Sequence, residues 1–254
     1  MTDVTSHPPG TPSWVDVTSS DVAATVEFYR ALFGWEAEEL ELGDGYTMLL
    51  KDGRLVAGVA PATSAEQPIV WHTYVSVADA SATAAAALEA GGRVVFGPID
   101  VFGRGKMAVF NDLGGAGVSI WEPGTHVGAE LVNTPDSFCW NELQTRRPDE
   151  AKTFYGRVFG WGERTSDFRG MAYTEWLRDE DSIAGMRQMP PTVPETMPAF
   201  WLVYFGVADC DVAVAKATGL GASVLVPPLD SPAGRFSVLQ DPFGASLALI
   251  ALEF

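Results

Sequence analysis

The sequence predicts an α+β protein built from tandem βαβββ units, four in total, arranged as two modules. Two observations lead to this prediction. Residues 28–35 (FYRALFGW) return as residues 154–161 (FYGRVFGW), with five of eight positions identical at an offset of 126. Around both copies, the hydrophobic pattern runs in the order strand, amphipathic helix and short strands, and this order occurs twice in a module.

The repeat extends well beyond the FY…FGW segment. Further pairs occur in the same order along the chain, and their offset drifts only from 126 to 131. These pairs are Trp14 with Trp140, Asp16 with Glu142, Gly58 with Gly185, Tyr74 with Tyr204, Arg104 with Arg235, and Asp112 with Asp241. Such an ordered series indicates a duplicated module. We place the modules at residues 13–122 and 137–254, with a flexible tail at 1–12 and a linker at 123–136.

The elements of the first module follow from periodicity and from turn residues. A strand at 14–18 precedes a helix at 21–33, in which Val22, Val26, Tyr29 and Phe33 share one face and after which Gly34 ends the helix. The remaining elements are predicted as strands at 46–50, 55–59 and 72–77, a helix at 79–90, and strands at 94–95, 106–111 and 116–121.

Composition excludes several classes of partner. The chain has 16 basic and 33 acidic residues and a formal charge of −17, so it repels nucleic-acid phosphates and anionic lipids. It has no signal-peptide pattern and no run of about 18 apolar residues, which favours a cytoplasmic protein. Cys139 and Cys210 are predicted to be inert packing thiols. His7 and His126, in the tail and the linker, are predicted to be exposed.

The motifs of this sequence resemble those of a known family. A first strand, an acidic helix start, Phe-Tyr and then Phe-Gly-Trp resemble the opening of the vicinal oxygen chelate superfamily, which includes glyoxalase I, extradiol dioxygenases and bleomycin-resistance proteins. Residues 241–245 (DPFGA) resemble its closing turn, and residues 111–115 are a partial copy. Among its members, the chain is most similar to two-module actinobacterial hydroxylase-like, or 27 kDa antigen-like, proteins. The resemblance implies two cup-shaped glyoxalase-like modules, with helices outside and a small-molecule ligand inside each cup.

The resemblance also implies where family enzymes hold a divalent metal. The six matching positions are occupied here by Trp14, His72, Ser119, Trp140, Leu202 and Ala248. Only the histidine is a good metal ligand, whereas a mononuclear site needs about three protein ligands. We therefore expect no metal and no other cofactor, and this disfavours the family's metal-dependent lyase, isomerase and dioxygenase chemistry.

Strand alternation predicts which side chains line the cups instead. The predicted ligand-binding residues are Trp14, Tyr74, Ser119, Trp121, Trp140, Gln144 and Tyr204, which suit an aromatic or polycyclic ligand. The same rings could also fill the cups as core. Arg104 and Arg235 lie at matching loop positions, where they would either contact an anionic group of the ligand or only aid solubility.

Candidate catalytic groups are Asp16 and His72 in the first cup and Glu142, which faces Leu202, in the second. Two hypotheses remain open. The protein either binds its aromatic or polycyclic small molecule for sequestration or transport, or it is a cofactor-independent tailoring enzyme of secondary metabolism. Either a monomer or a homodimer fits the sequence.

Overall fold

The computed structural model describes residues 4–40, 45–168, 170–191 and 193–252. Residues 1–3 of the expected tail and the last two residues of the second module lie outside this part. The elements of the first module are β1 (Pro12–Ser19), α1 (Val22–Phe33), β2 (Glu36–Glu39), β3 (Thr47–Lys51), β4 (Arg54–Pro61), β5 (Trp71–Ser76), α2 (Ala80–Glu89), β6 (Arg93–Asp100), β7 (Gly105–Asn111) and β8 (Gly117–Pro123). Those of the second are β9 (Phe138–Thr145), α3 (Pro148–Phe159), β10 (Gly162–Phe168), β11 (Met171–Arg178), β12 (Asp181–Gln188), β13 (Phe200–Gly206), α4 (Cys210–Gly219), β14 (Ser223–Ser231), β15 (Gly234–Gln240) and β16 (Ser246–Leu252).

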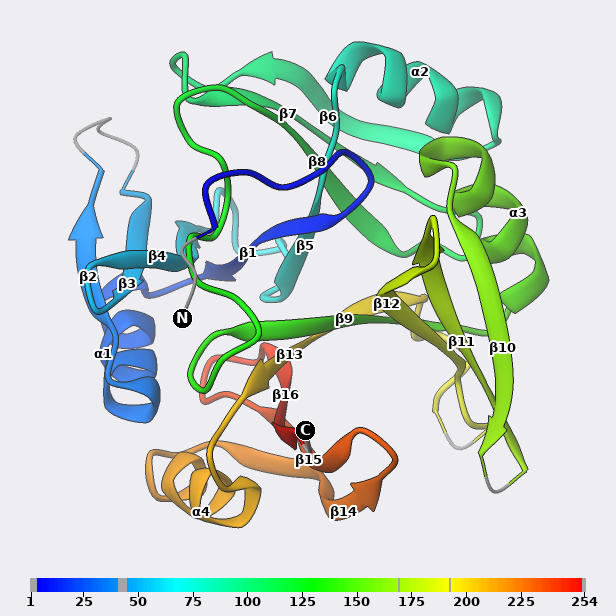
Figure 1. The fold of residues 1–254 in the computed structure, drawn as a ribbon. Helices are drawn as coiled ribbons and strands as arrows, with labels where there is room; N and C mark the ends of the chain where they lie inside the picture. Colours follow the sequence, from blue (N-terminus) through cyan, green and yellow to red (C-terminus); the bar gives the residue numbers. More distant parts are fainter. Residues whose placement is uncertain (1–3, 41–44, 169, 192, 253–254) are drawn as a thin grey trace.

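Each module is one eight-stranded curved sheet (Figure 1). The strand order is β2-β3-β4-β1-β5-β8-β7-β6 in the first and β10-β11-β12-β9-β13-β16-β15-β14 in the second, so the two sheets share one topology. Within a unit the first strand pairs in parallel with the last, and the two units join through an antiparallel pair, β1 with β5 or β9 with β13. The predicted α+β fold of two glyoxalase-like modules is confirmed.

The helix ends follow from local sequence. The carboxylate of Asp21 accepts a hydrogen bond from the backbone N–H of Ala24 at 3.0 Å, and Asp79 and Asp209 cap α2 and α4 in the same way. Helix α1 ends at Gly34, whose φ of 73° is the left-handed conformation that glycine adopts at low cost. The predicted helix at 21–33 is therefore observed almost residue for residue. Strand β2 was not predicted, because its sequence EAEE has no alternation of polar and apolar residues.

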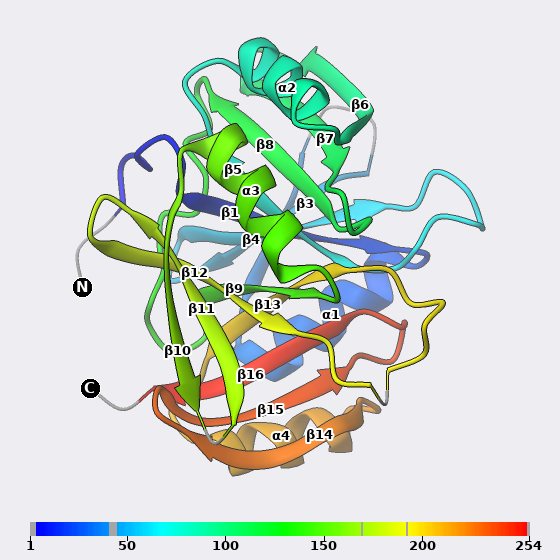
Figure 2. The same ribbon diagram turned by 90° about the vertical axis from the view of Figure 1, so that its right-hand side faces the viewer.

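The two modules pack against each other through their helical, convex sides. Helix α1 lies beside α4 and α2 beside α3, so each pair joins the two modules (Figures 1 and 2). Between them, Thr73 of β5 donates to the Oδ1 of Asn141 of β9 at 2.8 Å. Two large buried clusters each contain residues of both modules; for example, Trp71 packs edge-on against Phe205. The hydrophobic core is thus largely shared between the modules.

The polar atoms of the repeated FY…FGW segment bridge the modules. Tyr29 donates to Asp241 Oδ2 at 2.7 Å, and its counterpart Tyr155 donates to Asp112 Oδ2 at 3.1 Å. The two tryptophans of the repeat act in the same way: Trp35 donates to the Asp136 carbonyl at 2.8 Å and Trp161 to the Gly10 carbonyl at 2.7 Å. Each module therefore holds the chain that precedes the first strand of the other.

The linker folds back across the first module. The backbone N–H of Ala129 donates to the Ser13 carbonyl, and the His7 ring contacts the Ala129 carbonyl oxygen at 2.8 Å. The prediction that both histidines are exposed is wrong. His7 is partly buried, and His126 is only 8% exposed because its ring packs edge-on against Trp14 and Trp121.

Both cysteines are buried and free, as predicted. Burial raises the pKa of the Cys139 thiol to about 12 and that of Cys210 to about 11, so neither forms a thiolate readily. Within the described residues, no helix combines the length and the apolar character needed to cross a membrane.

Candidate functional site: two cups with one repeated constellation

A buried carboxyl lies at the centre of the first cup. Strand register places Asp16 opposite His72 and Trp14 opposite Tyr74, on the face turned away from the helices. Asp16 Oδ2 accepts hydrogen bonds from the hydroxyls of Tyr74 at 2.8 Å and Tyr46 at 3.0 Å. The Trp14 indole donates to the Tyr46 oxygen at 3.0 Å. Asp16 is 3% exposed, and its second oxygen, Oδ1, has no hydrogen-bond partner in the described part of the chain.

The second cup repeats this arrangement. Glu142 Oε1 accepts from the Tyr204 hydroxyl at 3.1 Å and from the side-chain amide of Gln144. Tyr173 also hydrogen-bonds to this carboxyl, and the Trp140 indole donates to the Tyr173 oxygen at 2.9 Å. Each cup therefore contains a carboxyl between two tyrosines, one of which is supported by a tryptophan.

Two glycines make room for this constellation. Gly58 pairs in register with Asp16, and Gly185 pairs with Glu142. A Cβ at Gly58 would lie 2.1 Å from the Tyr46 hydroxyl, and one at Gly185 would lie 2.0 Å from that of Tyr173. Glycine is thus required at positions 58 and 185, because a tyrosine side chain passes directly over each of them.

Burial controls the protonation of both carboxyls. Burial raises the pKa of Asp16, and this effect exceeds the opposing effects of the nearby His72 charge and the two tyrosine hydrogen bonds. Burial likewise raises the pKa of Glu142, against the opposing charge of Arg187. The carboxyl groups of Asp16 and Glu142 are therefore protonated more readily in the cups than they would be in water.

The His72 ring and the Asp16 carboxyl have different hydrogen-bond partners. Its Nε2 lies 2.7 Å from the hydroxyl of Thr18, and the Asp16 oxygen bonds to tyrosines instead. The histidine influences Asp16 through its charge, without a direct hydrogen bond between the two side chains. In the second cup the matching residue is Leu202, opposite Glu142, as the repeat predicts.

The other predicted lining residues divide into two groups. Trp14, Tyr74 and Trp121 are buried members of the core, and the Trp121 indole donates to the His126 carbonyl at 2.8 Å. Ser119 is also buried and hydrogen-bonds to Tyr74. Gln144 and Tyr204 are buried too, whereas Trp140 is only partly buried. The tryptophan of the first cup is thus covered by the linker histidine, and its counterpart in the second cup is more accessible.

The two loop arginines differ in their surroundings. Arg235 forms ion pairs with Asp211 at 2.6 Å and Asp230 at 2.9 Å, on the outer side of the module, and these account for it without a ligand. Arg104 lies near His126, where its charge adds to the effect of burial and lowers the pKa of that ring to about 4. Its side chain makes no hydrogen bond or ion pair with the described residues.

The residues at the family's ligand positions do not fit a metal. Trp14 and Trp140 use their indole N–H groups as donors to tyrosines, and an indole offers no lone pair to an ion. Leu202 and Ala248 offer none either. No group of three or more His, Cys, Asp or Glu residues in the described chain is placed to hold a metal ion.

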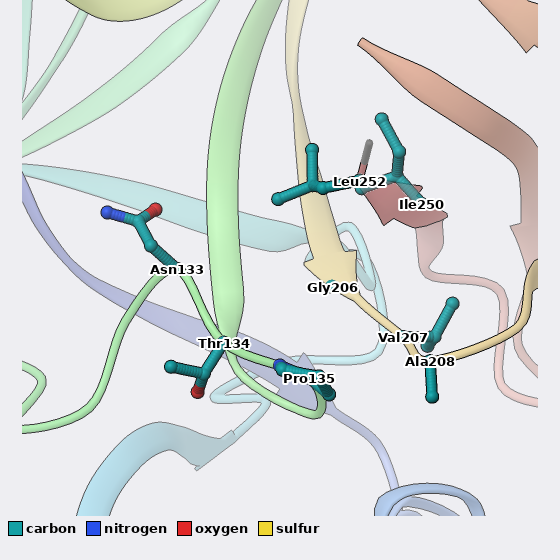
Figure 3. Close-up of a pocket in the computed structure, with 8 residues that line it drawn as sticks. All are labelled: Asn133, Thr134, Pro135, Gly206, Val207, Ala208, Ile250 and Leu252. Atoms are coloured by element: carbon teal, nitrogen blue, oxygen red, sulfur yellow. The ribbon is translucent and has the colours of Figure 1, made fainter. Parts of the chain in front are cut away.

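Two small cavities lie outside the carboxyl constellations. One of about 200 Å³ opens where β13 and β16 end, between linker residues 133–135 and Gly206, Ile250 and Leu252 (Figure 3). The other, of about 250 Å³, lies between the closing turn of the first module and residues 195–199. Neither is lined by Asp16 or Glu142.

Sequence reasoning missed Tyr46, Tyr173 and Arg187. A signal for the tyrosines was present: they match at an offset of 127, the same offset as that of Gly58 and Gly185. Arg187 has no such signal, because Ala60 takes its place in the first module.

Comparison with known proteins agrees with this fold. Residues 11–120 match the model of the glyoxalase/bleomycin resistance protein/dioxygenase superfamily, and residues 140–250 match that of the glyoxalase-like domain. The chain belongs to this superfamily, which confirms the resemblance read from its motifs.

Its relatives are proteins of similar length. The anthracycline biosynthesis proteins DauV of Streptomyces sp. (strain C5) and DnrV of Streptomyces peucetius are each 36% identical to it, over 98% of this chain and 96% of theirs. CFP32 of Mycobacterium tuberculosis is 36% identical over 95% of this chain and 94% of its own. The Mn(II)-bound glyoxalase from Novosphingobium aromaticivorans shares the fold, with a TM-score of 0.66 and 17% identity over 96% of this chain and 83% of that one.

Proposed function

We propose that this protein binds a planar aromatic or polycyclic small molecule in its cups, without a metal, in a sequestration or carrier role. The observation that carries this proposal is the repeated constellation of one carboxyl, two tyrosines and one tryptophan. Such a set offers flat faces for stacking together with hydroxyl and carboxyl groups that bind the polar edge of a ligand.

The second cup is the stronger candidate for binding. Its Trp140 is partly exposed, whereas the matching Trp14 of the first cup is buried beside His126. The tyrosines Tyr46 and Tyr173 are partly exposed in both cups. The relatives support the class of ligand, because DauV and DnrV are named for anthracycline biosynthesis and anthracyclines are polycyclic aromatic compounds.

Quenching of tryptophan fluorescence by anthraquinone and related planar compounds tests the proposal. Trp140→Ala should weaken binding by about tenfold, as is usual for a stacking aromatic. Trp14→Ala should have a smaller effect, because its ring is covered. Phe102→Ala removes an exposed aromatic outside the cups and serves as the control. The proposal fails if no compound quenches saturably, or if both folded tryptophan variants bind like the parent.

A tailoring enzyme is the second candidate, favoured by the two buried carboxyls with raised pKa values. Asp16, His72 and Glu142 would then transfer protons to or from a bound substrate. Incubation with candidate polyketides followed by mass spectrometry separates the two functions, because only an enzyme changes the mass or retention of the compound. If turnover occurs, His72→Ala should reduce it by about a hundredfold, and Glu142→Gln should reduce it less. Full activity of His72→Ala would remove the assigned role of this histidine.

A further inference from the structure

We propose that the second cup selects aromatic ligands that carry a carboxylate, and that Arg187 binds this group. The inference rests on the proposed function and names the ligand class of one cup.

The strand register places Arg187 inside the second cup. It lies on β12, opposite Gln144 of β9 and Tyr173 of β11. It is two residues from Gly185, so both point to the same face of the sheet, and Gly185 lies opposite Glu142. Its charge acts on both Glu142 and Tyr204. The guanidinium therefore belongs to the same constellation as the carboxyl.

Arg187 differs from the paired arginines of the described chain. Six of these arginines pair with acids, as Arg164 does with Glu175, and Arg146 donates to backbone carbonyls. Arg187 is partly buried, yet it makes no hydrogen bond or ion pair with any residue that the structure describes. Among the described arginines it shares this with Arg104, although the chain has about twice as many acidic as basic residues. A ligand carboxylate would supply the two parallel hydrogen bonds that it lacks.

Glu142 is poorly placed to be that partner. Its carboxyl is already bound by Tyr204, Tyr173 and Gln144. Burial also favours its neutral form, which lessens repulsion of an incoming carboxylate.

The walls of the cup suit the aromatic part of such a ligand. Partly buried apolar side chains pack around Leu202 and Tyr204, namely Trp140, Phe200, Phe236, Val238 and Leu252. The first cup lacks the arginine, since Ala60 stands at the position of Arg187, and it has His72 at the position of Leu202. The selectivity should thus belong to the second cup alone.

A matched pair of probes tests this inference. Anthracene-2-carboxylic acid and anthracene-2-carboxamide have nearly the same shape, but only the acid is charged. Titration followed by tryptophan fluorescence should show the acid binding at least about tenfold more tightly, although the chain is strongly acidic. Arg187→Gln should lower the acid's affinity to about that of the amide, so that the preference is lost. Arg187→Lys should retain part of it, because the charge stays and the paired geometry is lost. Arg164→Gln, at an exposed ion pair, is the control.

The outcomes separate the two proposals. If neither probe nor any other planar compound binds, the proposed function fails. If both probes bind equally well to the parent protein, the inference is overturned while the proposed function stands. This result does not depend on the folding of any variant. A preference for the acid that survives in folded Arg187→Gln would also overturn the role of Arg187.

Discussion

Asp16 shows how a single buried group connects the site to the stability of the fold. Its two tyrosine hydrogen bonds both reach Oδ2, so the carboxyl is tightly oriented while Oδ1 remains without a partner in the described chain. Burial raises its pKa above the usual 3.8. The folded protein therefore binds a proton here more readily than the unfolded chain does.

This shift predicts a pH dependence of defined sign. As pH rises from about 4, the unfolded chain loses the proton first, so the contribution of Asp16 to the free energy of unfolding falls until pH exceeds the raised pKa. Asp16→Asn keeps an oxygen acceptor for both tyrosines and cannot titrate. Thermal unfolding between pH 4 and 8 should therefore show the variant gaining stability relative to the parent as pH rises.

Asp211→Asn provides a control that should not vary over this range. The hydrogen bonds from Arg235 lower the pKa of Asp211 below its usual 3.8, so its contribution is lost only at pH values below about 4. If the difference between Asp16→Asn and the parent does not change with pH, Asp16 does not titrate as its burial implies.

At the scale of the element, strand alternation predicted more of the site than any other signal. It placed Trp14 and Asp16 of β1 on one face, together with His72 and Tyr74 of β5, as the register shows. It could not reveal Tyr46, which precedes β3 and reaches Asp16 only because β4 carries a glycine beneath it. The exposure of His126 was mispredicted because its burial depends on tertiary packing of the linker, which leaves no periodic pattern in the sequence.

The glycine in β4 gives a direct test of this packing. Gly58→Ala should place a methyl group against the Tyr46 hydroxyl and displace it from Asp16. We expect a loss of about 1–3 kcal/mol in the free energy of unfolding, measured by chemical denaturation. Gly117→Ala is the matched control, because a Cβ there meets only Asn111 at an ordinary 3.6 Å. Equal effects of the two substitutions would contradict the proposed fit.

At the scale of the whole molecule, the repeated motif serves the contact between modules as well as the fold of each one. Tyr29 accepts a hydrogen bond from Trp71 at 2.9 Å and donates to Asp241, and Tyr155 does the same between Trp201 and Asp112. The sequence revealed the repeat. It could not show that these tyrosines act across the modules, because a single-module pattern carries no information about the other module.

Removal of one of these hydroxyls should destabilise the entire chain. Tyr29→Phe leaves Asp241 Oδ2 and the Trp71 indole without this partner, which should cost about 1–3 kcal/mol of the free energy of unfolding. Tyr155→Phe should cost a similar amount, and the double variant should show roughly the sum. Glu27→Gln, an exposed change on the same helix, should have little effect. If a phenylalanine variant unfolds like the parent, the bridge contributes nothing to stability.

The bridges between the modules are reciprocal: Tyr29 contacts the second module as Tyr155 contacts the first, and Trp35 and Trp161 follow the same rule. This is the pattern of an isologous dimer interface that has been joined into one polypeptide. Its thermodynamic consequence is cooperativity, because neither half can unfold without exposing the aromatic core of the other. A ligand held in only one cup should therefore raise the melting temperature of the whole chain in a single transition.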